Sequence, residues 1–223
     1  MKNIIIAIDG PAGSGKSTTA KIVAEKLGYI YIDTGAMYRA VTLACIERNT
    51  EITDIEVNKV VDDIKIELKQ SAHGQRTYLD GKDVSDEIRR PDVTKLVSPV
   101  SAMAYVREKM VEQQREMGHK GGVVMDGRDI GTVVFPQAEL KIFLIASISA
   151  RANRRLKELQ HKGFDNSVEE IMAQIDARDN YDSSREISPL RKADDAIEID
   201  TSDITINEQT SKILDLVNDL IKE

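Results

Sequence analysis

Short apolar runs alternate with stretches of helical periodicity along most of this chain. The apolar runs lie at residues 4–8, 29–32, 122–126, 140–146 and 196–200. Each is short enough for a buried strand, and the segments between them have the spacing of helices that bury one face. This alternation is typical of a parallel sheet with helices on both of its faces. The pattern therefore predicts an α/β fold.

The end of the chain carries a strongly amphipathic helical pattern. Its apolar positions form one stripe: Ile206, Ile213, Leu214, Val217, Leu220 and Ile221. Thr205 and Glu208 have the spacing of a capping box, which marks a helix start. We expect this helix to pack its stripe against the sheet.

Two stretches interrupt the alternation. Between about 63 and 90 the chain reads as short strands, at 64–68 and 76–79, with Asp80-Gly81 as a hairpin turn signal. We interpret this stretch as a small inserted β subdomain. The stretch 150–191 has few apolar residues and many charges, and it is interpreted as a mobile, solvated helical hairpin that acts as a lid. Its charged residues include Arg151, Arg154, Arg155, Arg178, Arg185 and Arg191 among Asp176, Asp179 and Asp182.

A phosphate-binding motif follows the first apolar run. Residues 10–17 read Gly-Pro-Ala-Gly-Ser-Gly-Lys-Ser and match GxxxxGK[ST], and the helical pattern that follows ends at Gly28. Backbone N–H groups of such a loop and the helix dipole behind it bind phosphate, Lys16 reaches the β and γ phosphates, and Ser17 offers its hydroxyl to Mg²⁺. A purely structural glycine turn is the alternative. The motif predicts that a nucleoside triphosphate is bound by Gly10, Pro11, Ala12, Gly13, Ser14, Gly15, Lys16, Ser17 and Thr18.

Composition narrows the choice of partners. The 223 residues are 41% hydrophobic and carry a net charge of -7, with no basic stripe, so nucleic acid is a poor partner. The apolar run near the amino terminus is too short for a signal peptide, and no apolar run is long enough to span a membrane. Cys45, the single cysteine, is interpreted as buried filler. A cytoplasmic protein without a membrane partner is expected.

A second anion site is predicted beside the phosphate loop. The segments 33–39 and 126–132 each follow a predicted strand, and ligands of parallel sheets bind at the carboxyl ends of strands. Their arginines, Arg39 and Arg128, are suited to clamp a phosphate monoester. A single arginine would rather be interpreted as part of a surface ion pair, but two at strand ends near a phosphate loop favour the functional interpretation. A second anion site and a lid indicate a kinase, which must bind an acceptor and exclude water.

Histidine chemistry is not expected. His73, His119 and His161 lie in polar contexts without partner spacing, and we interpret them as exposed. An acceptor that is itself a phosphate is anionic at neutral pH and needs no general base. The sequence therefore favours a nucleoside monophosphate acceptor over an alcohol.

Three motifs together carry a resemblance to a known family. They are Ile8-Asp9 with the phosphate loop, Asp33-Thr34-Gly35-Ala36-Met37-Tyr38-Arg39, and Asp126-Gly127-Arg128-Asp129-Ile130-Gly131-Thr132-Val133-Val134-Phe135-Pro136. With these motifs the chain resembles, end to end, the bacterial cytidylate kinases, which phosphorylate CMP and dCMP with ATP and Mg²⁺. The resemblance implies a P-loop NTPase core at 1–33, 100–149 and 187–223, a monophosphate-binding insert at 34–99 and a lid at 150–186.

The resemblance also implies roles for individual residues. Lys16, Arg128 and Arg185 would be catalytic. The monophosphate would be held by Thr34, Arg39, Arg128 and Arg185, and Thr34 stands where many relatives have serine. The cytosine would be bound by Ser98, Arg107 and Asp129, and the sugar by Arg178 and Asp182. Residues 178–185 keep the spacing of Arg and Asp that is found in the family, whereas neighbouring charged positions differ from the family pattern.

The chemistry of the base supports the cytosine assignment. Cytosine presents an amino donor at N4 beside acceptors at N3 and O2, so Asp129 can accept from N4 while Arg107 donates to the acceptors. Uracil reverses this edge and leaves mismatched polar groups. Alternatives remain a kinase for uridylate, shikimate or a coenzyme precursor, or a regulatory module that binds ATP without transferring phosphate. The expected partners are small-molecule substrates, and a monomer is expected.

Overall fold

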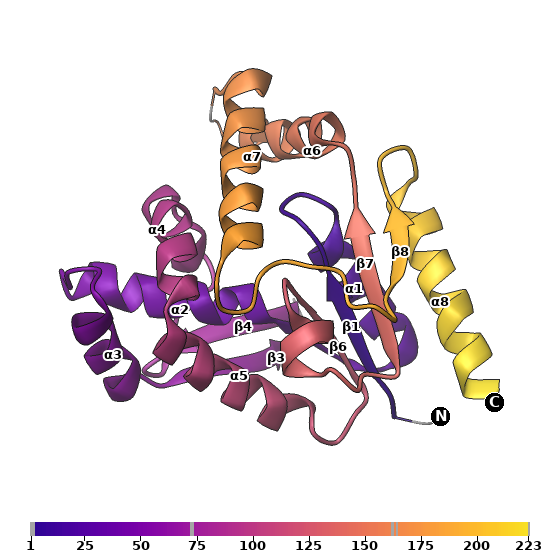
Figure 1. The fold of residues 1–223 in the computed structure, drawn as a ribbon, viewed down its shortest axis with the longest axis horizontal. Helices are drawn as coiled ribbons and strands as arrows, with labels where there is room; N and C mark the ends of the chain where they lie inside the picture. The colour runs from indigo at the N-terminus through magenta and orange to yellow at the C-terminus, as the bar shows by residue number, and fades with distance from the viewer. Residues whose placement is uncertain (1–2, 72–73, 162, 164, 223) are drawn as a thin grey trace.

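The core of the molecule is a five-stranded parallel sheet (Figure 1). The computed structural model describes residues 3–71, 74–161, 163 and 165–222. The strands are β1 (Ile5–Asp9), β2 (Ile30–Asp33), β6 (Val123–Gly127), β7 (Leu140–Ile145) and β8 (Ile197–Asp200), in the order β2-β6-β1-β7-β8. Each begins and ends within one residue of a predicted apolar run, so the predicted α/β fold is confirmed.

Helices cover both faces of this sheet. On one face, α1 (Lys16–Leu27) and α8 (Ile206–Lys222) pack with the even-numbered isoleucines of β1. On the other, α5 (Ala104–Gly118) and the π-helical turn η2 (Ile130–Val134) pack around Ala7 and Met125. The predicted cap of α8 forms as well, since the Glu208 N–H donates to Thr205 Oγ1 at 3.2 Å.

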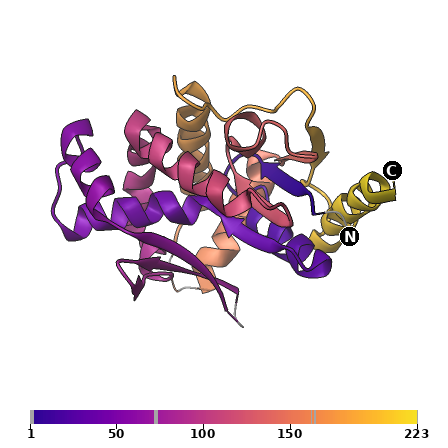
Figure 2. The same cartoon turned by 90° about the horizontal axis from the view of Figure 1, so that it is seen from below.

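A second unit lies beside the sheet and contains the small antiparallel sheet that the sequence predicted. Figure 2 shows this sheet running alongside α2. Asp80 and Gly81 both have positive φ, 51° and 82°, as a two-residue hairpin turn requires, and they join β4 to the short β5. Its elements are α2 (Thr34–Glu47), α3 (Asp54–Asp63), β3 (Ile66–Ser71), β4 (Gly74–Leu79), β5 (Lys82–Asp83), the 3₁₀ turn η1 (Glu87–Arg89) and α4 (Pro91–Ala102).

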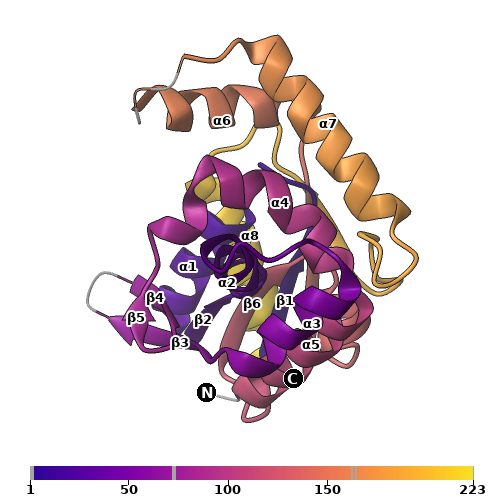
Figure 3. The ribbon, with the colours of Figure 1, turned by 90° about the vertical axis from the view of Figure 1, so that its left-hand side faces the viewer.

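The charged stretch folds into two helices, α6 (Ile148–His161) and α7 (Val168–Ser184), which arch over the carboxyl ends of the strands (Figure 3). Buried aliphatic side chains of Ala152, Ile171 and Ile175 join them in a small core of their own. The predicted helical hairpin is therefore present. Its mobility and the division of the chain into core, insert and lid stay predictions.

The remaining sequence predictions concern single residues and the membrane. Cys45 is buried in α2 and His119 is exposed, as predicted. His73 and the side chain of His161 lie outside the described residues. None of the helices in the described part of the chain combines the length and apolar content that crossing a bilayer demands.

Candidate active site

The predicted phosphate loop connects β1 to α1 and has a backbone that requires glycine. Gly10 has a φ of 146°, and a Cβ at this position would lie 2.1 Å from the carbonyl oxygen of Leu144. The buried ammonium of Lys16 donates to the carbonyl of Pro11 at 2.6 Å, so it lies against the loop. Burial and then the neighbouring Arg128 lower the pKa of Lys16 well below its ordinary value. The pKa of Lys16 is set by opposing effects, because the nearby Asp126 and Asp9 favour its charged form.

A carboxylate at the end of β6 faces the start of α1. Asp126 accepts hydrogen bonds from Ser17 Oγ at 2.8 Å and from the Tyr31 hydroxyl at 2.7 Å. Burial and then Asp33 raise the pKa of Asp126 to about 6. A hydroxyl and a carboxylate are oxygen ligands that suit Mg²⁺, which usually completes its shell with phosphate oxygens and water.

The pair Ser17–Asp126 was only half predicted from the sequence. The phosphate-loop motif predicts Ser17 as the residue that holds the metal, but no such role is predicted for Asp126. A signal for it exists, because P-loop enzymes hold the metal with an acid on a strand beside the phosphate loop. Among the described residues, no group of three or more acidic, histidine or cysteine side chains lies together as a metal site.

Asp9 is another residue whose position the sequence did not explain. Its buried carboxylate accepts from the backbone N–H groups of Ile130 at 2.9 Å and Gly131 at 2.8 Å. Burial raises the pKa of Asp9 to about 7, although these two N–H groups oppose the shift. Asp9 therefore ties the end of β1 to the loop that carries Arg128 and Asp129.

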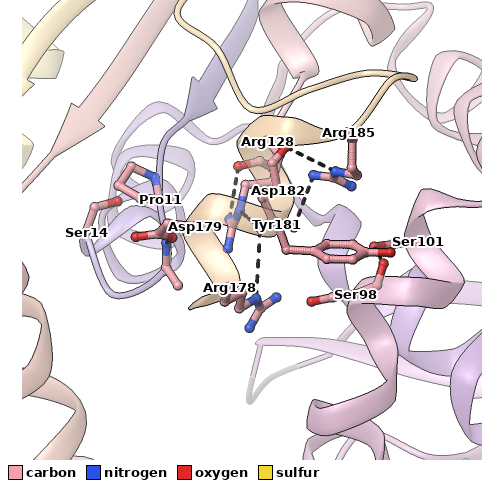
Figure 4. Close-up of polar contacts among 12 residues, drawn as sticks. Pro11, Ser14, Ser98, Ser101, Arg128, Arg178, Asp179, Tyr181, Asp182 and Arg185 are labelled. Atoms are coloured by element: carbon pink, nitrogen blue, oxygen red, sulfur yellow. Dashed lines mark hydrogen bonds and ion pairs between the residues drawn. The ribbon is translucent and has the colours of Figure 1, made fainter. Parts of the chain in front are cut away.

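Three arginines surround Asp182 of α7 (Figure 4). Arg128 Nε donates to its carboxylate at 2.9 Å, Arg185 lies at 3.3 Å and Arg178 at 3.9 Å. Burial acts to raise the pKa of Asp182, but the three guanidinium groups outweigh it and lower the pKa. The fold thus joins the predicted phosphate-side Arg128 and Arg185 to the predicted sugar-side Arg178 and Asp182.

The two residues predicted to read cytosine lie side by side. Arg107 of α5 and Asp129 form a buried ion pair. Arg107 also donates to the carbonyl of Ser101 at 3.1 Å and lies 5.3 Å from the centre of the Tyr38 ring. Ser98 is half-buried on the neighbouring α4, where its carbonyl accepts from Ser101 Oγ at 3.0 Å.

The two remaining monophosphate-side residues are held by contacts within the protein. Arg39 donates to Thr94 Oγ1 at 2.9 Å, and burial followed by Arg178 and Arg89 lowers its pKa to about 9. The hydroxyl of Thr34 is buried and donates to the carbonyl of Asp126 at 2.7 Å. Phosphate contacts by both residues stay predictions.

The α6–α7 hairpin also contacts the phosphate loop. Asp179 accepts from the backbone N–H of Ala12 at 3.1 Å and pairs with Arg151, which donates to the carbonyl of Ala12 at 3.1 Å. Arg154 reaches the carbonyl of Gly13 at 3.5 Å. The sequence indicated only that this segment is rich in charge and gave no sign of which charges touch the loop.

The arrangement as a whole favours anionic ligands. Within the described residues, the buried Nε of Arg178 and Nη2 of Arg185 have no hydrogen-bond partner. Burial and then Arg128 lower the pKa of Arg178 to about 10, so the cations around Asp182 repel one another. Buried donors and mutually repelling cations are satisfied by phosphate oxygens. The site can therefore hold two phosphorylated ligands next to each other, one at the phosphate loop and one at the arginines.

Comparison with known proteins identifies the family of this chain. Residues 6–219 match the family model for cytidylate kinase. The chain is 53% identical over 218 residues to a cytidylate kinase of Bacillus cereus, covering 97% of each chain, and 54% identical over 217 residues to one of Bacillus anthracis, covering 97% of this chain and 96% of the relative. A crystal structure of an uncharacterized protein from Eubacterium ventriosum shares the fold at a TM-score of 0.53 and 13% identity, covering 96% of this chain and 98% of that one. This chain belongs to the cytidylate kinase family.

Proposed function

We propose that this kinase transfers the γ-phosphoryl group of ATP to CMP or dCMP, giving CDP or dCDP. The observation that carries the proposal is the buried pair Arg107–Asp129, which lies next to the arginines around Asp182. A carboxylate beside a guanidinium matches the amino donor and the acceptors of cytosine. A phosphate loop on one side and a cytosine-matching pair on the other define the two substrates of the reaction.

The acceptor phosphate is assigned to Arg39, Arg128 and Arg185, with the hydroxyl of Thr34 beside them. Arginine forks bind phosphate oxygens in pairs, and the buried Nη2 of Arg185 supports this role, since it makes no hydrogen bond and faces Asp182 only as an ion pair at 3.3 Å. Asp182 and Arg178 are assigned to the sugar. Asp182 also keeps the arginines close together, because its carboxylate offsets their mutual repulsion.

The transfer step requires positioning and charge neutralisation. An anionic oxygen of the acceptor phosphate forms a bond to the γ-phosphorus, while the bond to the oxygen that bridges the β and γ phosphates breaks and ADP leaves. Lys16, Arg128 and Arg185 stabilise the negative charge that spreads over the transferred group. The α6–α7 hairpin, which already contacts Ala12, excludes water from this step.

The metal expected in this reaction is Mg²⁺ bound with ATP. Ser17 and Asp126 would hold it, and its charge would neutralise phosphate oxygens. Their contact at 2.8 Å brings a hydroxyl and a carboxylate together at the phosphate loop, as an oxygen-preferring cation requires. Asp126 must be ionised for this role.

We expect the site to select the base strictly and the sugar loosely. Asp129 and Arg107 face the polar edge of cytosine, so UMP would leave buried groups mismatched. Asp182 and Arg178 can hold a sugar through its 3′-hydroxyl, which both CMP and dCMP possess. The 2′-hydroxyl is then dispensable.

A coupled assay of ADP formation with CMP, dCMP, UMP and AMP tests the proposal. CMP and dCMP should support similar kcat/KM values, UMP a much lower one, and ATP turnover without an acceptor should be negligible. Equal use of UMP and CMP would contradict the assignment of the Arg107–Asp129 pair. ATP turnover that needs no monophosphate would indicate a regulatory ATP-binding module.

The cellular location, the oligomeric state and the partners of the enzyme are part of the same proposal. We assign it to the cytoplasm, as a monomer with small-molecule substrates as its partners. The net charge of -7, without a basic stripe, supports the exclusion of nucleic acid. Sedimentation analysis checks the oligomeric state.

A further inference from the structure

The cleft-facing side of α7 carries one aromatic residue among its charged ones. Arg178, Tyr181 and Asp182 stand at i, i+3 and i+4, which places them on one face of the helix, and Arg185 follows at its C-cap. The three charged members are assigned to the acceptor nucleotide. Tyr181 lies beside them, and none of the contacts assigned to ATP, the acceptor phosphate, the base edge or the sugar involves it.

Tyr181 is the one aromatic residue among the large apolar side chains that are exposed in the described part of the chain. Its side chain is 40% exposed, and it lines a cavity of about 300 Å³ together with Ala102, Ser184, Arg185, Glu186 and Ile187. Ile187, at 42%, is a second exposed apolar side chain in the same cavity. Apolar surface that stays open beside a charged site points to a ligand with both an apolar face and polar groups.

The ring is directed at the region that holds the base-reading residues. Figure 4 shows Tyr181 pointing from α7 toward Ser98 and Ser101 of α4. The carbonyl of Ser101 accepts from Arg107, the residue assigned to the acceptors of cytosine. The ring therefore faces the segment of α4 that positions Arg107. In Figure 4, Asp182 lies between the Tyr181 ring and the phosphate loop.

We propose that Tyr181 is a further substrate-binding residue, whose ring stacks on the pyrimidine of the acceptor nucleotide. The inference rests on the proposed function, since it takes Arg107 and Asp129 as contacts of the base edge. The two contacts differ in what they recognise. Edge contacts distinguish cytosine from uracil, whereas stacking accepts any base because every base has a π-face.

This difference gives a kinetic test. Tyr181→Ala should raise KM about 10-fold for CMP and for UMP alike, leaving their ratio and the KM for ATP unchanged, while Tyr181→Phe should keep the KM of the unmodified enzyme. Asn180→Ala, at an exposed neighbour on α7, is the control for damage to the helix. Unchanged KM for both nucleotides in Tyr181→Ala would overturn the proposal, and so would a rise confined to ATP.

A binding test separates stacking from closure of the hairpin. The chain has no tryptophan, so Tyr181→Trp carries a single indole. CMP should quench its fluorescence, whereas ribose 5-phosphate and ATP should leave it nearly unchanged. Tyr29→Trp, just before β2 at the opposite end of the sheet, should respond to none of them.

Equal quenching by ribose 5-phosphate and CMP would show that the phosphate moves the helix and that the base does not contact residue 181, which overturns the proposal. Quenching by ATP alone would assign the ring to the adenine instead and overturn it as well. Failure of the unmodified enzyme to phosphorylate CMP would reject the proposed function, whereas normal CMP turnover with unresponsive residue 181 variants rejects only this inference.

Discussion

The ATP side and the acceptor side of the site are built in different ways. The ATP side comes from consecutive residues 10–18, whose shape follows from local backbone geometry such as the positive φ of Gly10. The acceptor side draws its residues from α2, α5, the loop after β6 and α7, and Arg128 and Asp182 are 54 residues apart. The ATP side therefore depends on a local sequence, and the acceptor side depends on how α5 and α7 pack against the sheet.

The largest effect is expected from a substitution on the ATP side. Lys16→Ala should lower kcat by about 100-fold or more, because its ammonium neutralises charge that develops on the γ-phosphoryl oxygens. Steady-state turnover of CMP, with circular dichroism to verify folding, measures this. Lys26→Ala, at an exposed position in the last turn of the same helix, is the control. A folded Lys16→Ala enzyme with near-normal kcat would contradict the role of the loop.

The next effect concerns the carboxylate that would hold the metal. The pKa of Asp126 is raised to about 6, so its ionised fraction falls as the pH drops below that value. Since only the carboxylate binds Mg²⁺, kcat/KM for MgATP should fall about tenfold per pH unit below pH 6. Asp126→Asn should be slower at pH 8 and lack this acidic limb. Identical pH profiles for the two enzymes would assign the limb to another group.

A smaller effect is expected from a mild change on the acceptor side. Asp129→Asn keeps the acceptor oxygen for cytosine but adds an amide donor that suits O4 of uracil. The ratio of kcat/KM for CMP to that for UMP should therefore fall about 10-fold. Asparagine is preferable to alanine here, because its oxygen can still accept a hydrogen bond from the buried Arg107 although the charge of the ion pair is lost. An unchanged ratio would remove Asp129 from base selection.

The same contrast explains what the sequence could and could not predict. The five strands were predicted to within one residue because buried parallel strands are continuous apolar runs, and the P-loop was predicted because its function lies in its backbone. The pairing of Arg128 with Asp182 was not predictable, since it results from packing between distant segments. The role of Asp9 was missed for the same reason: its partners are N–H groups that lie 121 and 122 residues away.

We propose that the acceptor side is completed when α6 and α7 close over both substrates. Hydrogen exchange of residues 148–184 tests it most directly, measured in the free enzyme, with CMP alone and with a bisubstrate analogue that occupies both sides. Exchange should slow sharply with the bisubstrate analogue and little with CMP alone, because closure requires phosphates at both the loop and the arginines. Equal protection in the free and doubly liganded enzyme would contradict the claim and indicate a static hairpin.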